Sequence, residues 1–221
     1  MIFDHGSRSK LTPHDLPRFD DATLFHRVAR KVCEAGCLPR KELYEAWEVA
    51  RRTRRRFRGG RVLDLACGHG LLAQLLLLLD DSSVDAIAVD VRIPESAQHL
   101  ARCLAEEWPR LAGRIALARG PLSSIEARAG DLIVSCHACG SLTDEVLSQA
   151  IAVGARVAVL PCCHDKVDND QGGLGGWLDS ALAVDVTRAA RLRSHGYAVH
   201  TQTIPAAITP KNRLLLGEIR G

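Results

Sequence analysis

The sequence predicts an α/β protein built on a doubly wound, mostly parallel sheet. From position 61 to 161, short apolar segments of strand type alternate with segments of helical type. This alternation implies parallel strands joined by right-handed helical crossovers. A Gly-x-Gly turn, Gly68 to Gly70, follows the first of these strands. A chain of 221 residues is also long enough to bury one full core, so we expect one domain.

The residues before the first strand are expected to form a small helical layer. Positions 1–19 carry scattered charges without periodicity, which predicts a loop or a frayed arm. From position 20 to 57 apolar residues recur at helical spacing, and Gly36 and Pro39 divide this stretch into two helices. The expected divisions of the chain are 1–58, the N-terminal arm and helical layer, and 59–221, the main domain.

Seven strands are predicted in the main domain. They cover 62–67, 84–90, 114–119, 131–136, 155–161, 197–204 and 213–219. The helices between them cover 70–79, 94–107, 142–153 and 178–194, with a short helical segment near 122–127. The last two strands are joined through residues 205–212, and this connection suits an antiparallel hairpin at the edge of the sheet.

Composition favours a cytoplasmic protein with reduced thiols. No stretch reaches the roughly 18 uninterrupted apolar residues of a membrane span, and the N-terminus lacks the apolar core of a signal peptide. Eight cysteines would suit a disulfide scaffold in a small secreted chain. A chain of this length has a large core and no need of such cross-links.

The turn after the first predicted strand is the most informative motif. Gly68 and Gly70 allow a ligand to come close to the backbone, because no Cβ stands in the way. Read literally, Gly68-x-Gly70-x-x-Ala73 fits a dinucleotide-binding turn, but the nearby carboxylate of Asp64 would repel a pyrophosphate. S-adenosylmethionine carries an ammonium and a sulfonium and no phosphate. Asp64 therefore favours S-adenosylmethionine over NAD as the cofactor.

A second acid follows at the expected distance. Asp90 ends the second predicted strand, about twenty residues after the turn, where a carboxylate can accept both ribose hydroxyls. The alternative is that Asp90 only caps the end of the strand. Its position after this particular turn favours the ribose role.

Cysteine and histidine gather after the fourth and fifth predicted strands. In an open α/β sheet, ligands bind at the carboxyl ends of the strands. If the first, fourth and fifth strands are neighbours, these side chains converge with those of the turn on one rim. The residues of this rim are Cys67, His69, Cys136, His137, Cys139, Cys162, Cys163 and His164.

Three interpretations of the rim remain open. The cysteines could simply pack as small apolar residues. They could hold zinc, although the adjacent pair Cys162-Cys163 does not match the spacing of structural zinc sites. The third interpretation is a substrate pocket in which His137, His164 and Asp165 accept protons, because imidazole titrates close to neutral pH.

Seven arginines precede the first predicted strand, between Arg51 and Arg61. Such a run either ends an exposed helix or holds phosphate groups. The formal net charge of +3 is too small to identify a partner by itself.

Two later segments carry weaker signals. The glycine-rich segment 171–176 is either a mobile lid over a binding site or a surface connection. In the second interpretation, which we favour, Trp177 packs on the following helix. Lys211 and Arg213 introduce the last strand and could touch phosphate or lie in a solvated turn.

Three segments together resemble a branch of the class I S-adenosylmethionine-dependent methyltransferases. They are Asp64-Leu-Ala-Cys-Gly-His-Gly70, His137-Ala-Cys-Gly-Ser-Leu-Thr-Asp144 and Pro161-Cys-Cys-His164. The branch includes methyltransferase-like proteins and the tRNA 2′-O-methyltransferases that modify the acceptor stem. The first segment is general to methyltransferases, whereas the two Cys/His segments are more specific. The resemblance covers roughly residues 40–219 and implies a Rossmann-like sheet.

The resemblance also implies a role for each matching residue. The methionine end of the cofactor would lie at Asp64, Ala66, Cys67, Gly68, His69, Gly70 and Cys136. Asp90 would bind the ribose, and the adenine would lie near Val91, Pro121 and Leu122. The catalytic residues would be His137, Asp144, Cys162 and His164, with Thr143 beside them and no metal ion.

RNA, most directly tRNA, is the acceptor that the resemblance implies, with the arginines between Arg51 and Arg61 on its backbone. The zinc-finger segments of the eukaryotic tRNA enzymes have no match in this sequence. Two alternatives stay open. The acceptor could be a protein side chain or a small molecule, or the chain could bind S-adenosylmethionine without transferring its methyl group.

Overall fold

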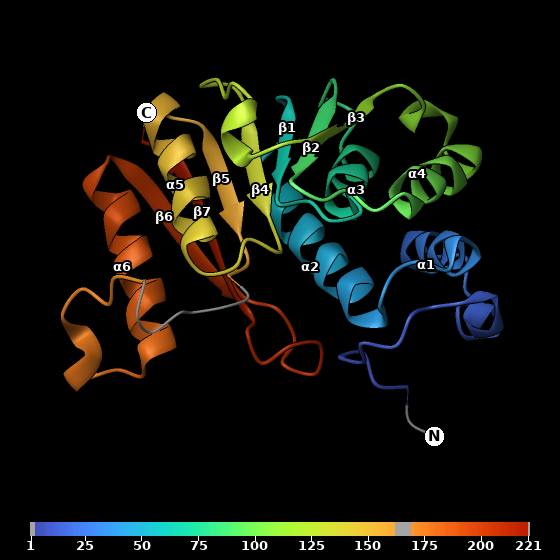
Figure 1. Ribbon diagram of the computed structural model, residues 1–221, viewed down its shortest axis with the longest axis horizontal. Helices are drawn as coiled ribbons and strands as arrows, with labels where there is room; N and C mark the ends of the chain where they lie inside the picture. Colours follow the sequence, from blue (N-terminus) through green and yellow to red (C-terminus); the bar gives the residue numbers. More distant parts are fainter. Residues whose placement is uncertain (1–2, 162–168, 221) are drawn as a thin grey trace.

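A computed structural model describes residues 3–161 and 169–220 and shows a seven-stranded sheet between two layers of helices (Figure 1). The strands are β1 (Val62–Leu65), β2 (Ala86–Asp90), β3 (Ile115–Arg119), β4 (Leu132–Ser135), β5 (Arg156–Val159), β6 (Tyr197–Thr203) and β7 (Arg213–Ile219). Their order in the sheet is β3-β2-β1-β4-β5-β7-β6. The first five strands are parallel, and β7 lies antiparallel between β5 and β6.

Six α-helices flank this sheet in the described part of the chain. They are α1 (Leu24–Ala35), α2 (Arg40–Arg56), α3 (Leu71–Leu79), α4 (Ser96–Glu107), α5 (Ser141–Val153) and α6 (Ser180–Ser194). Helices α2, α3 and α4 cover one face of the sheet, and α1 packs against α4. Helices α5 and α6 cover the other face. None of the helices described is long and apolar enough to cross a membrane.

The predicted fold class is confirmed. All seven expected strands form, β1 has β2 and β4 as neighbours, and β6 and β7 make the expected antiparallel hairpin at the edge. The ends of some elements differ. The first strand stops at Leu65, because Ala66 takes a positive φ of 57° and begins the turn. The segment near 122–127 contains only the short 3-10 turn Leu122–Ser124.

Helix α3 explains the uninterrupted leucine run. Eight of its nine residues are buried, because it lies between the sheet, α2 and α4 and has no face toward solvent. The same apolar core continues from α1 and α2 through α3 into the sheet. Residues 3–58 therefore share a core with the rest of the described chain.

The N-terminal segment packs on the domain, so the expectation of a frayed arm is wrong. Leu11 and Phe19 are buried in the core. The backbone N–H of Leu11 donates to the carbonyl of Leu38 at 2.9 Å, and that of Lys41 donates to the carbonyl of Ser7 at 3.0 Å. Isolated apolar residues and backbone hydrogen bonds hold this segment, and neither produces a periodic pattern in the sequence.

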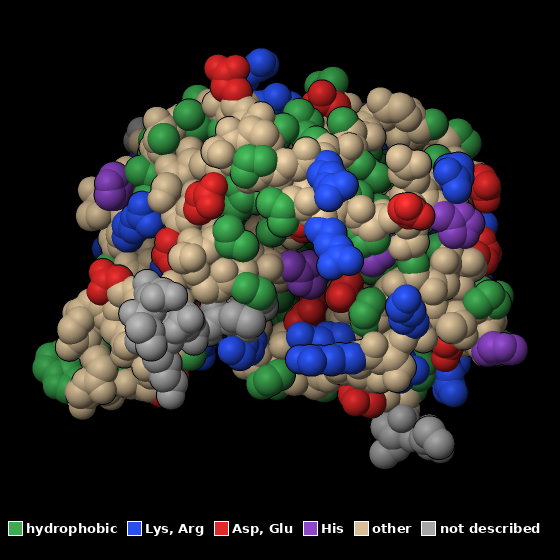
Figure 2. All heavy atoms as spheres, in the orientation of Figure 1, with side chains coloured by type: hydrophobic (Ala, Val, Ile, Leu, Met, Phe, Trp, Pro, Cys, Tyr) green, Lys and Arg blue, Asp and Glu red, His purple; other side chains and the backbone are tan. Residues whose placement is uncertain are grey.

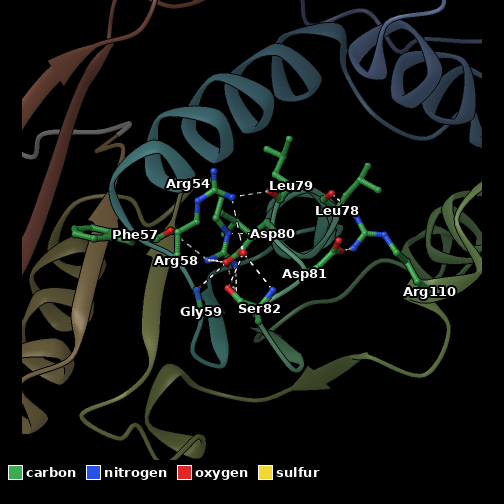
Figure 3. Close-up of polar contacts among 12 residues, drawn as sticks. Arg54, Phe57, Arg58, Gly59, Leu78, Leu79, Asp80, Asp81, Ser82 and Arg110 are labelled. Carbon is green, nitrogen blue, oxygen red and sulfur yellow. Dashed lines mark hydrogen bonds and ion pairs between the residues drawn. The ribbon is translucent and has the colours of Figure 1, made fainter.

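The arginine run lies at the amino ends of the parallel strands, because α2 ends there and leads into β1. Arg54 is only 2% exposed. Its guanidinium donates to Ser83 Oγ at 2.7 Å and lies 3.0 Å from a carboxylate oxygen of Asp80, within the network of Figure 3. Burial lowers the pKa of Arg54 to about 10. Arg54 therefore joins α2 to the segment after α3. It neither lies on an exposed helix end nor is free to hold phosphate, which were the two interpretations of the run.

Five of the other six arginines in the run also have partners within the protein. Arg51 and Arg52 pair with Glu48. The remaining three pairs are Arg56 with Glu218, Arg58 with Asp80 and Arg61 with Asp131. The run lies at the edge of the sheet opposite the Gly-x-Gly turn. An RNA backbone bound beside that turn would therefore be remote from these arginines.

The glycine-rich connection leads into α6 and contains the 3-10 turn Leu174–Gly176. Trp177 is 88% exposed. The expectation that Trp177 packs on the following helix is therefore wrong. An indole is buried only against a neighbouring apolar surface, and the exposure of Trp177 shows that it lacks one among the described residues.

Candidate functional site

The candidate site lies at the carboxyl ends of the parallel strands. The arrowheads of β4 and β5 point to the lower edge of the sheet in Figure 1, and α2 begins near the same edge. The space-filling view shows histidine and acidic side chains together in a recess there, with lysine and arginine side chains around it (Figure 2). This is the edge at which the topology of an open α/β sheet places ligands.

The two glycines of the turn have different physical roles. Both have a positive φ, 54° at Gly68 and 70° at Gly70. A Cβ on Gly70 would lie 3.0 Å from Leu117 Cδ2 and 3.3 Å from Ala88 Cβ, so packing against β2 and β3 requires glycine there. A Cβ on Gly68 would meet nothing within 4 Å. The backbone at Gly68 is therefore open to a ligand.

Asp64 lies buried beneath this turn. The carboxylate is 1% exposed and accepts one hydrogen bond, from the backbone N–H of Ala73 at 3.1 Å. Burial raises the pKa of Asp64 to about 7, and the negative charge of Asp90 contributes to the rise. A cation beside Asp64 would stabilise its charged form.

Asp90 joins the end of β2 to the turn. Its carboxylate accepts the backbone N–H of Gly68 at 3.0 Å on one oxygen and that of Arg92 at 2.9 Å on the other. Asp90 therefore caps the end of its strand, which was the alternative to a role in binding the ribose. Each carboxylate oxygen has a second lone pair, so these contacts leave it able to accept hydroxyl groups as well.

A narrow pocket opens between the start of α2 and the turn. It brings together five of the residues that the sequence indicated, with α2 as its opposite wall. Its lining residues are Leu38, Glu42, Ala46, Asp64, Cys67, His69, Leu71, Leu72, Cys136 and His137.

Sequence reasoning missed the contribution of α2 to this pocket. Glu42 and Ala46 lie four residues apart on one face of the helix, and Leu38 lies just before its start. Burial raises the pKa of the Glu42 carboxyl, and the charge of Glu45 adds to the rise. The sequence did contain a signal for this wall of the pocket. Glu42 and Glu45 lie on the inward side of an amphipathic helix, and buried carboxylates are rare without a partner or a function.

The two histidines of the pocket are neutral at pH 7. Burial lowers the pKa of His137 to about 4, and the positive charge of Lys41 contributes. The pKa of His69 is also lowered by burial, and the charge of Lys10 contributes. One ring nitrogen of His69 lies 3.1 Å from Ser96 Oγ. A neutral imidazole has one free acceptor nitrogen, so His137 can accept a hydrogen bond from a hydroxyl or an amine.

Asp144 does not lie with the other candidate residues in this pocket. Its two carboxylate oxygens receive a bidentate pair of bonds from Arg188, at 3.0 and 2.7 Å, and Asn169 Nδ2 donates to it at 3.1 Å. Arg188 is 2% exposed and also donates to the carbonyl of Gly140 at 2.9 Å. The pair joins α5 to α6 and holds the loop that carries His137.

Other bonds complete the shape of that loop. Thr143 Oγ1 donates to the carbonyl of Ala138 at 2.7 Å, and the N–H of Ala138 donates to Ser135 Oγ at 3.1 Å. Cys139 is exposed, whereas Cys136 is buried. The hydroxyl of Thr143, in the first turn of α5, therefore ties that helix to the loop.

The ends of β2 and β3 lie side by side where an adenine is expected. The N–H of Gly120 donates to the carbonyl of Asp90 at 3.0 Å. Val91 is 65% exposed, Pro121 is exposed and Leu122 is buried. An exposed apolar side chain next to the turn offers a flat ring a surface to cover.

Part of the predicted site falls outside the described residues. Cys162, Cys163, His164 and Asp165 all belong to the segment 162–168. Among the residues that are described, no group of three or more histidine, cysteine or acidic side chains could hold a metal ion.

The order of the seven strands and the Gly-x-Gly turn after β1 are those of the class I methyltransferase fold. Residues 41–170 match the model of a family described as a methyltransferase domain, which is more than half of the chain. The chain belongs to this family. The match confirms the expected methyltransferase domain.

Several solved structures with the same fold are described as methyltransferases, and their sequence identity to this chain is low. An O-methyltransferase family protein from Burkholderia thailandensis has a TM-score of 0.53 and 20% identity over 96% of this chain and 64% of its own. Ribosomal protein L11 methylase from Lactobacillus delbrueckii subsp. bulgaricus has a TM-score of 0.50 and 16% identity over 80% of this chain and 77% of its own.

TrmK from M. capricolum, solved with S-adenosylhomocysteine, has a TM-score of 0.50 and 13% identity over 78% of this chain and 67% of its own. This chain spans less than two thirds of the length of the Burkholderia protein. No curated protein shows significant sequence similarity to it. The structural likenesses establish the shared fold.

Proposed function

We propose that the enzyme binds S-adenosylmethionine along the carboxyl ends of β1, β2 and β3 and methylates an acceptor that enters beside His137. The observation that carries this proposal is the open space over Gly68, which two carboxylates flank. Asp90 accepts the N–H of Gly68 within the turn, and Asp64 accepts the N–H of Ala73, which follows the turn. This arrangement matches a ligand with a cationic end and a ribose.

Each part of the cofactor has a matching group in the chain. The ammonium of the methionine end would pair with Asp64, whose pKa of about 7 allows ionisation once a cation is present. The ribose hydroxyls would donate to Asp90. The adenine would cover Val91 between the ends of β2 and β3.

The reaction requires mainly positioning from the protein. The bound cofactor supplies a methyl group on a sulfonium, which is already activated for displacement. The chain must hold the acceptor in line with that methyl group, and the gain from such positioning is large. His137 would orient the acceptor by accepting its proton in a hydrogen bond. Asp144 and Arg188 would act indirectly, by fixing the loop that carries His137.

We propose RNA, most directly tRNA, as the acceptor. The two Cys/His segments resemble those of the acceptor-stem 2′-O-methyltransferases, and a neutral His137 suits a neutral hydroxyl nucleophile. A ribose hydroxyl is protonated at neutral pH and needs an acceptor for its proton as the new bond forms. A protein side chain or a small molecule is the alternative acceptor.

Two measurements test the proposal. Isothermal titration with S-adenosylmethionine and with NAD should show binding of the first alone, and binding of NAD alone would contradict the cofactor assignment. Transfer of labelled methyl groups should then be measured with tRNA, total protein and small metabolites as separate acceptors. Label in tRNA is the expected result, whereas label only in protein or metabolites would refute RNA as the acceptor.

A further inference from the structure

Three chain segments meet at the mouth of the pocket. They are the N-terminal residues 3–11, the first turn of α2 and the connection 204–212 between β6 and β7. The N–H of Lys41 donates to the carbonyl of Ser7 at 3.0 Å, which ties the first two segments together. A Cβ on Gly6 would lie 2.9 Å from the carbonyl oxygen of Ile208, so the first and third segments are in close contact.

A buried glutamate joins the third segment to α2. Glu45 is 3% exposed, accepts a hydrogen bond from the side chain of Thr209 and lies 3.2 Å from the ammonium of Lys41. The N–H of Lys211 in turn donates to Thr209 Oγ1 at 3.3 Å. The sequence motif that introduces the last strand is therefore anchored at the mouth and not in a free turn.

Each of the three segments contributes one lysine, and we call Lys10, Lys41 and Lys211 the lysine rim. Lys10 and Lys211 are exposed, and no ion pair with an acid is found for either among the described residues. Lys41 is a quarter exposed and keeps donors beyond the one that faces Glu45. Lysine and arginine side chains are visible around the recess in Figure 2.

The rim acts electrostatically on the pocket. The charge of Lys41 helps to lower the pKa of His137, and the charge of Lys10 helps to lower that of His69. The ammonium groups of Lys41 and Lys10 are thus close enough to the two imidazoles to affect their pKa values. Among the described residues, the acids in the first two turns of α2 are Glu42, which is half-buried, and Glu45, which is already paired.

We infer that the lysine rim holds the phosphate backbone of the RNA acceptor on either side of the nucleotide that enters beside His137. This inference rests on the proposed function, since it takes RNA as the acceptor. It replaces the arginines between Arg51 and Arg61, which lie at the opposite edge of the sheet and are mostly paired. Exposed ammonium groups are suited to phosphate because each presents three donors and a full charge.

The test is the salt dependence of RNA binding. Fluorescence anisotropy with fluorescein-labelled tRNA should be measured at several salt concentrations for the wild type and for Lys10→Gln/Lys211→Gln. Each lost phosphate contact should reduce the slope of log K against log salt by about 0.7 to 0.9, and the two together should weaken binding about tenfold at low salt. Both lysines are exposed, so the variant should fold.

A matched control removes the same charge elsewhere. Arg55→Gln/Arg193→Gln changes two exposed arginines in the last turns of α2 and α6, both at the amino edge of the sheet. This control should keep the wild-type slope. If it lost as much affinity as the rim variant, general charge and not the rim would hold the RNA, and the inference would fail.

Failure of the inference can be separated from failure of the proposed function. Wild-type methylation of tRNA together with an unchanged slope in the rim variant would overturn the rim and leave the function standing. Absence of tRNA binding in the wild type would overturn the rim and RNA as the acceptor, and titration with S-adenosylmethionine would still decide whether the cofactor site is correct. Both double variants should bind S-adenosylmethionine as the wild type does.

Discussion

The carboxylate of Asp90 and the backbone N–H of Gly68 form a hydrogen bond of 3.0 Å that joins the end of β2 to the turn after β1. The bond crosses from one strand to the next at the point where the open backbone of Gly68 faces outward. It makes the shape of the turn depend on the acid that is proposed to bind the ribose. Changes at either residue should therefore act on the cofactor.

Replacing Gly68 with alanine should abolish tight binding of S-adenosylmethionine. The added Cβ would occupy the open space in which the cofactor is proposed to lie, and the positive φ would add about 1 kcal/mol of backbone strain. Gly196→Ala is the matched control, because Gly196 also has a positive φ and open space but lies at the start of β6. Calorimetry should show a loss of at least tenfold in affinity for Gly68→Ala only, and equal affinities would place the cofactor elsewhere.

Asp90→Ala should also weaken binding of the cofactor. Hydrogen bonds to a charged group contribute about 1.5–3 kcal/mol each, and the variant also releases the N–H of Gly68. Asp90→Asn keeps one acceptor oxygen and should give an intermediate affinity. An unchanged dissociation constant in the alanine variant would remove Asp90 from the site.

The affinity for S-adenosylmethionine should fall as the pH drops below about 7. An ammonium group pairs with the ionised form of Asp64, whose pKa burial raises to about 7, so affinity should approach a tenfold loss per pH unit on the acid side. Asp64→Asn should bind more weakly and lose this dependence between pH 5 and 7. Parallel pH profiles in the two proteins would show that Asp64 does not face the ammonium.

The stability of the unliganded enzyme should depend on the same group with the opposite sign. The pKa of Asp64 is raised from 3.8 in the unfolded chain to about 7 in the fold. Its contribution to stability is therefore fully present below about pH 3.8 and is lost as the pH rises through 7. Asp64→Asn should remove this contribution, which denaturant unfolding between pH 5 and 8 would measure as a flatter profile than that of the wild type.

Asp144→Ala should act through stability. Among the described residues, it leaves the buried guanidinium of Arg188 with only the carboxylate of Asp185 as an ion-pair partner, at 3.7 Å. Because the side chain of Asp144 is 32% exposed, we expect a loss near the lower end for a buried pair, about 3 kcal/mol. Thermal denaturation should show a loss of roughly 10 °C for a chain of this size, and Asp144→Leu/Arg188→Met should recover much of it. A stable Asp144→Ala protein with greatly reduced kcat would instead show that Asp144 borders the reactive methyl group.

His137→Ala should reduce kcat about a hundredfold while the affinity for S-adenosylmethionine stays within about twofold, as expected for a residue that acts on the acceptor. The pH profile of the wild type should show no inflection from His137 between pH 5.5 and 8, because its pKa is about 4. An inflection near 6.5 that disappears in His137→Ala would contradict the neutral state of this half-buried imidazole.

Local patterns predicted most of the fold because strands and helices have different periodicities. The seven strands, the crossover helices and the Gly-x-Gly turn each occupy contiguous residues, and the handedness of crossovers limits the order of the strands. Asp64, Cys67, His69, Cys136 and His137 could be expected to meet because the carboxyl ends of neighbouring parallel strands share one edge. The structure brings these five into one pocket.

Contacts between distant segments could not be read in the same way. Asp144 pairs with Arg188 and Arg54 with Asp80, each across at least one intervening element. Nothing local in the sequence separates a buried arginine from an exposed one, since the distinction depends on which carboxylate the fold brings near it. For the same reason, Glu42 and the N-terminal segment did not stand out as parts of the site.

The sequence by itself therefore determined the class of the enzyme, the order of its elements and the edge of the sheet that holds the site. These follow from periodicity, glycine positions and the rules of parallel crossovers. Only the tertiary structure decided which charged residues are structural and which face the mouth of the pocket. Burial and ion pairing are properties of neighbours in space. Helix α2 begins at the edge of the sheet that holds the pocket and ends with the arginine run at the opposite edge.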